Sequence, residues 1–98
     1  KKDLLQGSVI FTDTYGNAIT NISKDIFNNA CKGRSFSILF GREDETISVI
    51  SNKYKDVPLA EKLALFTESN YLQIAINQGK ASELLGLSMY EIIRIEFK

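Results

Sequence analysis

The sequence predicts an all-β fold with one or two short helices, arranged as a small closed antiparallel barrel with Greek-key-like connections. Two observations carry this prediction. Apolar and polar residues alternate over several short runs, and clusters of Gly, Asn, Asp and Ser interrupt these runs roughly every ten residues, which is typical of sandwiches and barrels. With 98 residues, of which 44% are hydrophobic, the chain can bury one core and is expected to fold as one domain.

The first predicted element is a hairpin over 7–22. Val9 and Phe11 lie in a run that fits a pleated strand, and Ala18–Ile22 resumes an extended run. Between them, Asp13–Asn17 (DTYGN) holds Asp, Gly and Asn. These residues are typical of tight turns because Asp and Asn bond their own backbone and Gly accepts a positive φ. The turn carries more polar and aromatic side chains than a hairpin needs, which makes it a candidate binding site.

The next elements follow from the same signals. Ser23 has the chemistry of an N-cap for a short helix with Ile26 and Phe27 facing inward, and Gly33 ends that segment. Alternation predicts strands at 35–41, 46–51, 71–77 and 90–97, and helical spacing predicts a short helix over 79–85 with Gly86 as its C-cap. The charged segment 42–45 is predicted to be a solvated loop.

Two of these segments need a closer argument. Residues 60–66 have a helix-favouring composition but lie between strands, and we expect a short turn followed by a strand from Leu63. In the run 71–77, Leu72, Ile74 and Ile76 alternate with Tyr71, Gln73 and Ala75. Such alternation is typical of a strand with one face packed on a core.

Composition excludes several functions. Twelve basic residues balance twelve acidic ones, so there is no electrostatic case for binding nucleic acid or an anionic membrane. The single cysteine, Cys31, cannot form an internal disulfide, and we expect a reducing, cytoplasmic location. Without histidine the chain cannot form a Ser-His-Asp or Cys-His pair, and it lacks the usual zinc patterns. We therefore predict no metal site and favour a binding module over a self-sufficient enzyme.

Four segments, taken in order, resemble one known family. Residues 13–22 resemble the motif D-x-[FY]-G-N-x-x-T-N, residues 51–58 (SNKYKDVP) resemble S-x-x-Y-x-D-V-P, and residues 69–77 resemble S-G-Y-L-x-I-A-x-N. Residues 79–87 carry the matching G-x-A and L-G-L. The family is that of the S-adenosyl-L-methionine (SAM) hydroxide adenosyltransferases, or SAM hydrolases, which are related to the SAM-dependent fluorinase and chlorinase. The resemblance runs from Gly7 to the C-terminus.

The resemblance implies a domain organisation. Residues 7–98 would form a C-terminal β-barrel domain, and residues 1–6 the boundary to an N-terminal α/β domain that precedes it in the family. Family members are homotrimers in which the substrate lies between this barrel and the N-terminal domain of a neighbouring subunit. The reaction converts SAM to adenosine and L-methionine, with SAM as substrate and no cofactor. The catalytic residues belong to the N-terminal domain, so none is expected here, and this chain alone would be inactive.

The same resemblance assigns binding roles to residues of the first two segments. Asp13 matches a carboxylate that receives the methionine ammonium, and the alternative is an Asx-turn residue. Asn17 matches an amide that hydrogen-bonds the adenine edge, and the alternative is a turn residue that tolerates the left-handed region. Tyr15 and Tyr54 match aromatic positions near the adenosine, where the alternative is core or rim packing.

The third segment supplies the other candidates. Ser69 falls in the turn that would meet the methionine carboxylate. Glu68 beside it is a departure from the family, and its carboxylate would repel the ligand unless it points away or binds the ammonium. Asn70 stands where the family has Gly, and Asn tolerates the same turn conformation. The backbone at Asn77 and Gln78 matches the strand end that reads adenine through main-chain groups.

Two other functions stay open beside that of a substrate-binding domain. The barrel could bind adenosine or another nucleoside without turnover. It could also be purely structural and hold a trimer together, with the DTYGN turn kept for its geometry alone. The sequence does not distinguish water from halide as the nucleophile, because that choice belongs to the other domain.

Overall fold

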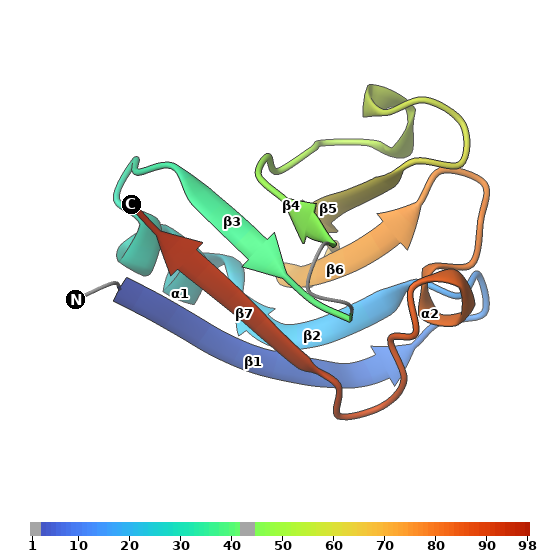
Figure 1. Cartoon of the computed structure of the whole chain (residues 1–98), viewed down its shortest axis with the longest axis horizontal. Helices are drawn as coiled ribbons and strands as arrows, with labels where there is room; N and C mark the ends of the chain where they lie inside the picture. Colours follow the sequence, from blue (N-terminus) through green and yellow to red (C-terminus); the bar gives the residue numbers. More distant parts are fainter. Residues whose placement is uncertain (1–2, 42–44) are drawn as a thin grey trace.

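The structure, a computed structural model, describes residues 3–41 and 45–98 and confirms the all-β prediction. Seven strands form one antiparallel, nearly closed, barrel-like sheet in the order β4-β3-β7-β1-β2-β6-β5 (Figure 1). The elements are β1 (Asp3–Thr12), β2 (Ala18–Ser23), α1 (Lys24–Cys31), β3 (Phe36–Leu39), β4 (Thr46–Ile47), the 3-10 turn η1 (Tyr54–Asp56), β5 (Lys62–Phe66), β6 (Tyr71–Ile76), α2 (Ala81–Leu84) and β7 (Ile92–Phe97).

The sheet closes between its two outer strands, β4 and β5. After β4 the chain runs on so that Ile50 lies opposite Ala64 of β5 in a parallel bridge. The N–H of Ser51 donates to the carbonyl oxygen of Ala64 at 2.8 Å. This short contact takes the place of a full ladder, and it leaves fewer exposed strand edges than an open sheet would have.

β1 begins at Asp3, four residues before the predicted hairpin. It pairs with β7 from Asp3 opposite Phe97 to Ser8 opposite Ile92, and from Val9 onward it pairs with β2, with a bulge between Val9 and Phe11. Residues 3–6, which we predicted to be a boundary segment, are therefore the first part of the barrel. No alternation marks them, because what fixes their extended conformation is the ladder to a strand near the other end of the chain.

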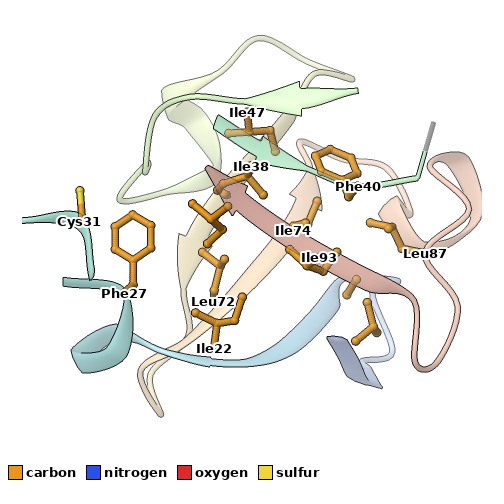
Figure 2. Close-up of a cluster of buried hydrophobic side chains, with 14 of the residues drawn as sticks. Ile22, Phe27, Cys31, Ile38, Phe40, Ile47, Leu72, Ile74, Leu87 and Ile93 are labelled. Atoms are coloured by element: carbon orange, nitrogen blue, oxygen red, sulfur yellow. The ribbon is translucent and has the colours of Figure 1, made fainter. Parts of the chain in front are cut away.

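The core lies inside the barrel and is apolar (Figure 2). Its labelled members come from β2, β3, β4, β6, β7 and α1, and from the segments that follow β3 and α2. Phe27 of α1 packs edge-on against Phe36, with ring centroids 5.1 Å apart, and against Phe66 at 5.7 Å. Such edge-to-face pairs add to the burial energy of the rings, so α1 is fixed to one end of the barrel.

The N-cap of α1 is confirmed, because Ser23 Oγ accepts a hydrogen bond from the N–H of Ile26 at 3.1 Å. Phe27 is buried as predicted, but Ile26 is 50% exposed. The prediction for Ile26 was wrong because adjacent helix positions point in different directions and only one face of α1 meets the barrel. The helix ends at Lys32, which takes the left-handed conformation (φ 50°) just before Gly33.

Several other predicted elements are shorter in the structure, including β3, which covers only Phe36–Leu39 of the predicted 35–41. β4 ends at Ile47 because the chain then leaves to bridge β5. β7 begins at Ile92 because 88–91 form a turn in which the N–H of Glu91 donates to Ser88 O. α2 covers only 81–84, and Gly86 follows it with φ 68° as the predicted terminator. The loop predicted at 42–45 lies largely outside the described residues.

Both faces of β6, the strand that leads to the candidate site, are covered. Leu72 and Ile74 face the barrel core, while Gln73 is 7% exposed and Ala75 is 0% exposed on the other face. Val57, from the segment between β4 and β5, packs on the cluster that contains Ala75. That segment therefore lies over the outside of the barrel.

Candidate functional site

The DTYGN turn is held by the side chain of Asp13. Its Oδ1 accepts hydrogen bonds from the N–H groups of Tyr15 and Asn17, both at 2.9 Å, and its Oδ2 accepts one from Asn17 Nδ2 at 3.0 Å. This is the Asx-turn arrangement named above as the alternative role. Asn17 does not have a positive φ; Gly16 does, at 82°. The turn therefore leaves the Asn17 side chain available for a specific contact, and that side chain is buried.

Gly16 fixes where this turn sits. Its carbonyl oxygen accepts a hydrogen bond from the N–H of Ser82 at 2.8 Å. A Cβ added at Gly16 would lie 2.6 Å from Lys80 Cβ, which is closer than real side chains allow. The backbone of the turn is therefore pressed against the start of α2, and only glycine fits there.

Tyr54 reaches the turn from a distant part of the chain. It lies on η1, and its hydroxyl accepts a hydrogen bond from Asn17 Nδ2 at 3.1 Å. Asp56 Oδ2 holds this segment by accepting from the N–H groups of Asn52 at 2.9 Å and Lys53 at 3.2 Å. The hydrogen bond from the Asn52 N–H is the main cause that lowers the pKa of Asp56 below its ordinary value of 3.8.

Asn77 ties the same segment to the end of β6. Its Nδ2 donates to Val57 O at 2.9 Å, its N–H donates to Glu61 O at 3.0 Å, and its carbonyl oxygen accepts from the N–H of Ala60 at 2.9 Å. The amide hydrogens of Asn77 are thus used within the chain. Gln78 comes next, in the left-handed conformation (φ 59°), in a turn closed by a bond from Gly79 N–H to Ile76 O.

These segments surround a cavity of about 860 Å³, which lies in the size range of ligand sites. It is lined by residues of the DTYGN turn, of η1 and of the β6–α2 connection: Thr14, Tyr15, Asn17, Lys53, Tyr54, Lys55, Ile76, Asn77, Gln78, Gly79 and Lys80. The lining combines apolar and aromatic surface, suited to a flat ring, with a buried amide that can form directional hydrogen bonds.

The mouth of the cavity is basic. Lys53, Lys55 and Lys80 line it and are exposed, and the lining contains no acidic residue. Within residues 3–41 and 45–98, none of these lysines forms a salt bridge. Their charges therefore favour a ligand with an anionic group.

Most of the predicted site residues meet at this cavity. Tyr15, Asn17, Tyr54, Asn77 and Gln78 line it, and Asp13 supports it from behind. The structure does not bring Glu68 and Ser69 there. Both are exposed in the β5–β6 turn, which lies at the opposite end of β6 from Asn77. A role for these two residues remains a prediction for an assembly in which another surface completes the site.

The three lysines are site residues that sequence reasoning missed. Lys53 and Lys55 flank Tyr54 within SNKYKDVP, and Lys80 follows the third segment. The sequence signal that could have identified these lysines was their position next to residues of the family-like motifs. It carried little weight because exposed lysines are usually solvated surface residues, and only the fold brings these three together.

Two further findings concern metal ligands and membrane-spanning helices. In the described part of the chain, no group of three or more His, Cys, Asp or Glu side chains is placed to hold a metal ion. Among these same residues, no helix has the length and apolar character needed to cross a bilayer.

Fold and cavity together define a small β-barrel domain with a pocket in the size range of ligand sites. Residues 7–94 match the family described as the SAM hydroxide adenosyltransferase C-terminal domain, and the chain belongs to this family. No curated protein matches the sequence significantly. Among solved structures, an uncharacterized conserved protein from Thermotoga maritima is 27% identical, with a TM-score of 0.79, over 97% of this chain and 38% of that one.

A second solved structure shares the fold. A conserved hypothetical protein from Thermus thermophilus is 24% identical, with a TM-score of 0.72. The match covers 92% of this chain and 34% of that one. The chain thus spans little more than a third of the length of either protein, and both likenesses support the barrel described above.

Proposed function

We propose that this chain is the adenosine-binding domain of an enzyme that hydrolyses SAM to adenosine and L-methionine. One observation carries the proposal. Three segments that resemble the family motifs, and that lie far apart in the sequence, contribute Tyr15, Tyr54 and Asn77 to one cavity. These residues come together only through folding, and each lies in a segment that resembles a motif of the same family. A common ligand explains this better than three unrelated structural turns would.

The chemistry of the cavity suits the adenosine part of SAM. Tyr15 and Tyr54 offer aromatic faces for a purine or ribose, and the Asn17 amide offers polar contacts to a base edge. Because the cavity is open on one side, a bound ligand would remain exposed to solvent there. We propose that the N-terminal domain of a neighbouring subunit in a homotrimer covers it and supplies the groups that activate water.

The remaining parts of the proposal rest on the family resemblance. Glu68 and Ser69 would act on the methionine part, at a distance from the cavity that only the assembled protein can bridge. The nucleophile would be water or hydroxide, with no cofactor. A cytoplasmic location rests on the single, buried Cys31 alone.

The test uses the intact protein that contains this domain. It is incubated with SAM, the products are separated by chromatography, and the 98-residue chain is the control. We expect adenosine and methionine from the intact protein and neither from the chain alone. Adenosine binding without products would instead indicate a nucleoside-binding module. Absence of both turnover and binding would favour a structural barrel and overturn the proposal.

A further inference from the structure

We infer that Lys53, Lys55 and Lys80 make the cavity prefer an adenosine derivative whose 5′ group is anionic, so that adenine nucleotides compete with SAM for the site. The inference goes beyond the proposed substrate, because SAM carries a sulfonium cation at its 5′ carbon, where an adenine nucleotide carries phosphate. It rests on the proposed function, since it takes the cavity to hold an adenosine unit.

The three lysines come from two separate segments around the cavity. Lys53 and Lys55 stand on either side of Tyr54 at η1, and Lys80 directly precedes α2. All three line the cavity and are exposed. A side chain that lines a cavity and is also exposed lies at its mouth, so a ligand that enters from solvent meets positive charge from both segments.

The stem of Lys80 is fixed against the DTYGN turn. A Cβ on Gly16 would lie 2.6 Å from Lys80 Cβ and 2.9 Å from its Cα, so the two backbones are in close contact. The Lys80 carbonyl oxygen accepts hydrogen bonds from the N–H groups of Glu83 at 3.2 Å and Leu84 at 2.9 Å, which join it to the first turn of α2. The ammonium group therefore starts from a fixed point beside Tyr15, and only the outer part of its chain is free to follow a ligand.

No carboxylate in the lining cancels these charges, because the lining has no acidic residue. Within residues 3–41 and 45–98, none of the three lysines forms a salt bridge. The pKa of Asp56 is lowered mainly by the Asn52 N–H and in part by the charge of Lys53, so Asp56 offsets part of that one charge. The charges of Lys55 and Lys80 have no such counterpart in the lining, and the mouth keeps a net positive charge.

The mouth is also where the charged end of a nucleotide would lie. The base gains most from the apolar and aromatic part of the lining, whereas a phosphate stays hydrated and favours the open side. There its oxygens can accept hydrogen bonds from ammonium groups, which adds to the attraction between the charges. A sulfonium or an amine in the same position is repelled by the same lysines.

The size of the preference follows from the exposure of the lysines. An exposed pair of opposite charges changes affinity by roughly twofold. Three such pairs acting on one phosphate give up to about tenfold. Salt screens exposed charges, so the preference should be measured at low ionic strength and should fade as salt is added.

The experiment measures the inhibition of SAM hydrolysis by the intact protein with three ligands that differ at one position. Adenosine 5′-monophosphate is anionic at the 5′ position, adenosine is neutral, and 5′-amino-5′-deoxyadenosine is cationic. We expect competitive inhibition, with the monophosphate bound about three- to tenfold more tightly than adenosine and the amine about twofold more weakly. Inorganic phosphate alone should inhibit much less than the monophosphate.

Two sets of variants test the two segments separately. Lys80→Gln, and the double variant Lys53→Gln with Lys55→Gln, should each reduce the ratio between the two inhibition constants by about two- to fourfold. Lys80→Arg keeps the charge and should keep the ratio. Lys32→Gln, an exposed lysine at the end of α1, is the matched control. A misfolded variant weakens all three ligands together, whereas a lost charge changes their ratio.

The outcomes separate this inference from the proposed function. If SAM is hydrolysed and the three ligands inhibit equally, or their order survives both sets of Gln variants, the inference is wrong while the proposed function stands. Inhibition by inorganic phosphate as strong as by the monophosphate would also overturn the inference. If the protein binds adenosine without turnover, the same affinity order is read by calorimetry. If it binds no adenosine at all, the proposed function and this inference both fail.

Discussion

Asn17 and Tyr54 lie 37 positions apart in the sequence and share a hydrogen bond of 3.1 Å from Nδ2 to the hydroxyl oxygen. This bond joins the β1–β2 turn to the segment that crosses the outside of the barrel. The cavity depends on that crossing, because Tyr54 and Lys55 of η1 form part of its lining.

Gly16→Ala should destabilise the protein more than a left-handed glycine elsewhere. Its φ of 82° disfavours any side chain, and the new Cβ would also meet Lys80. We expect a loss of about 2–3 kcal/mol in the free energy of unfolding, measured by urea denaturation. Gly33→Ala is the matched control, because it has φ 76° with nothing within 4 Å, and it should lose only about 1 kcal/mol. Equal losses would contradict the close approach.

Asn77→Ala should loosen the segment that covers β6. The substitution removes the bond to Val57 O and should lower the free energy of unfolding by about 1 kcal/mol. Hydrogen exchange at the Ala60 N–H should become faster, because this group bonds to the Asn77 carbonyl. Asn29→Ala, at an exposed site on α1, should leave that exchange unchanged. Unaltered exchange in Asn77→Ala would show that the side chain does not hold the segment.

Low pH should release the loop that carries Tyr54. The folded-state pKa of Asp56 lies below the ordinary value of 3.8, chiefly because its carboxylate accepts the Asn52 N–H. The stabilisation is therefore fully present above pH 3.8 and is lost as the pH falls through the lower folded-state pKa. The amide signals of Asn52 and Lys53 in an NMR titration should shift over that range. In Asp56→Asn these shifts should disappear, and their persistence would assign them to another group.

The basic mouth of the cavity should favour anionic ligands. We expect adenosine 5′-monophosphate to bind more tightly than adenosine, by about three- to tenfold at low salt, with the advantage fading as salt screens the charges. Replacing Lys53, Lys55 and Lys80 with Gln should remove the difference. Lys32→Gln, at the end of α1, is the control. A difference that survives the triple substitution would mean that the phosphate is bound elsewhere.

Tyr90→Gly should stabilise the turn before β7. Tyr90 has φ 69° and is 73% exposed, so its side chain forms little packing to offset the strain of the left-handed region. Relief of that strain exceeds the entropy cost of glycine, for a net gain of about 0.5–1 kcal/mol in the free energy of unfolding. Met89→Gly, in the same turn without positive φ, should instead lower it. Loss of stability in Tyr90→Gly would show that the ring packs against a partner.

Much of the fold could be predicted from local sequence. The 7–22 hairpin, the N-cap at Ser23 and the strand from Tyr71 follow from turn chemistry and alternation, which are properties of neighbouring residues. The start of β1 at Asp3 and the covered outer face of β6 could not, because they depend on strands and loops distant in the sequence. The last strand was predicted to begin two residues too early, at Tyr90, since Tyr is uncommon at positive φ.

The sequence also predicted only part of the candidate site. The motif resemblance identified Asn17, Tyr54 and Gln78, and the structure shows that they share one cavity. It could not show that the carboxylate oxygens of Asp13 accept hydrogen bonds from the turn itself. A carboxylate can either stabilise an Asx-turn or bind an ammonium group, and the sequence does not distinguish the two. Nor could it locate Ser69 at the far end of β6, since the spacing along a motif does not give distance in space.

The most direct test of the central claim is an NMR titration of the isotopically labelled chain with adenosine. The account predicts shifts at backbone amides around the cavity, chiefly those of Tyr15, Tyr54 and Gln78, with little change at Phe27 on the opposite end of the barrel. No shift at saturating adenosine, or shifts confined to residues outside the cavity, would contradict it.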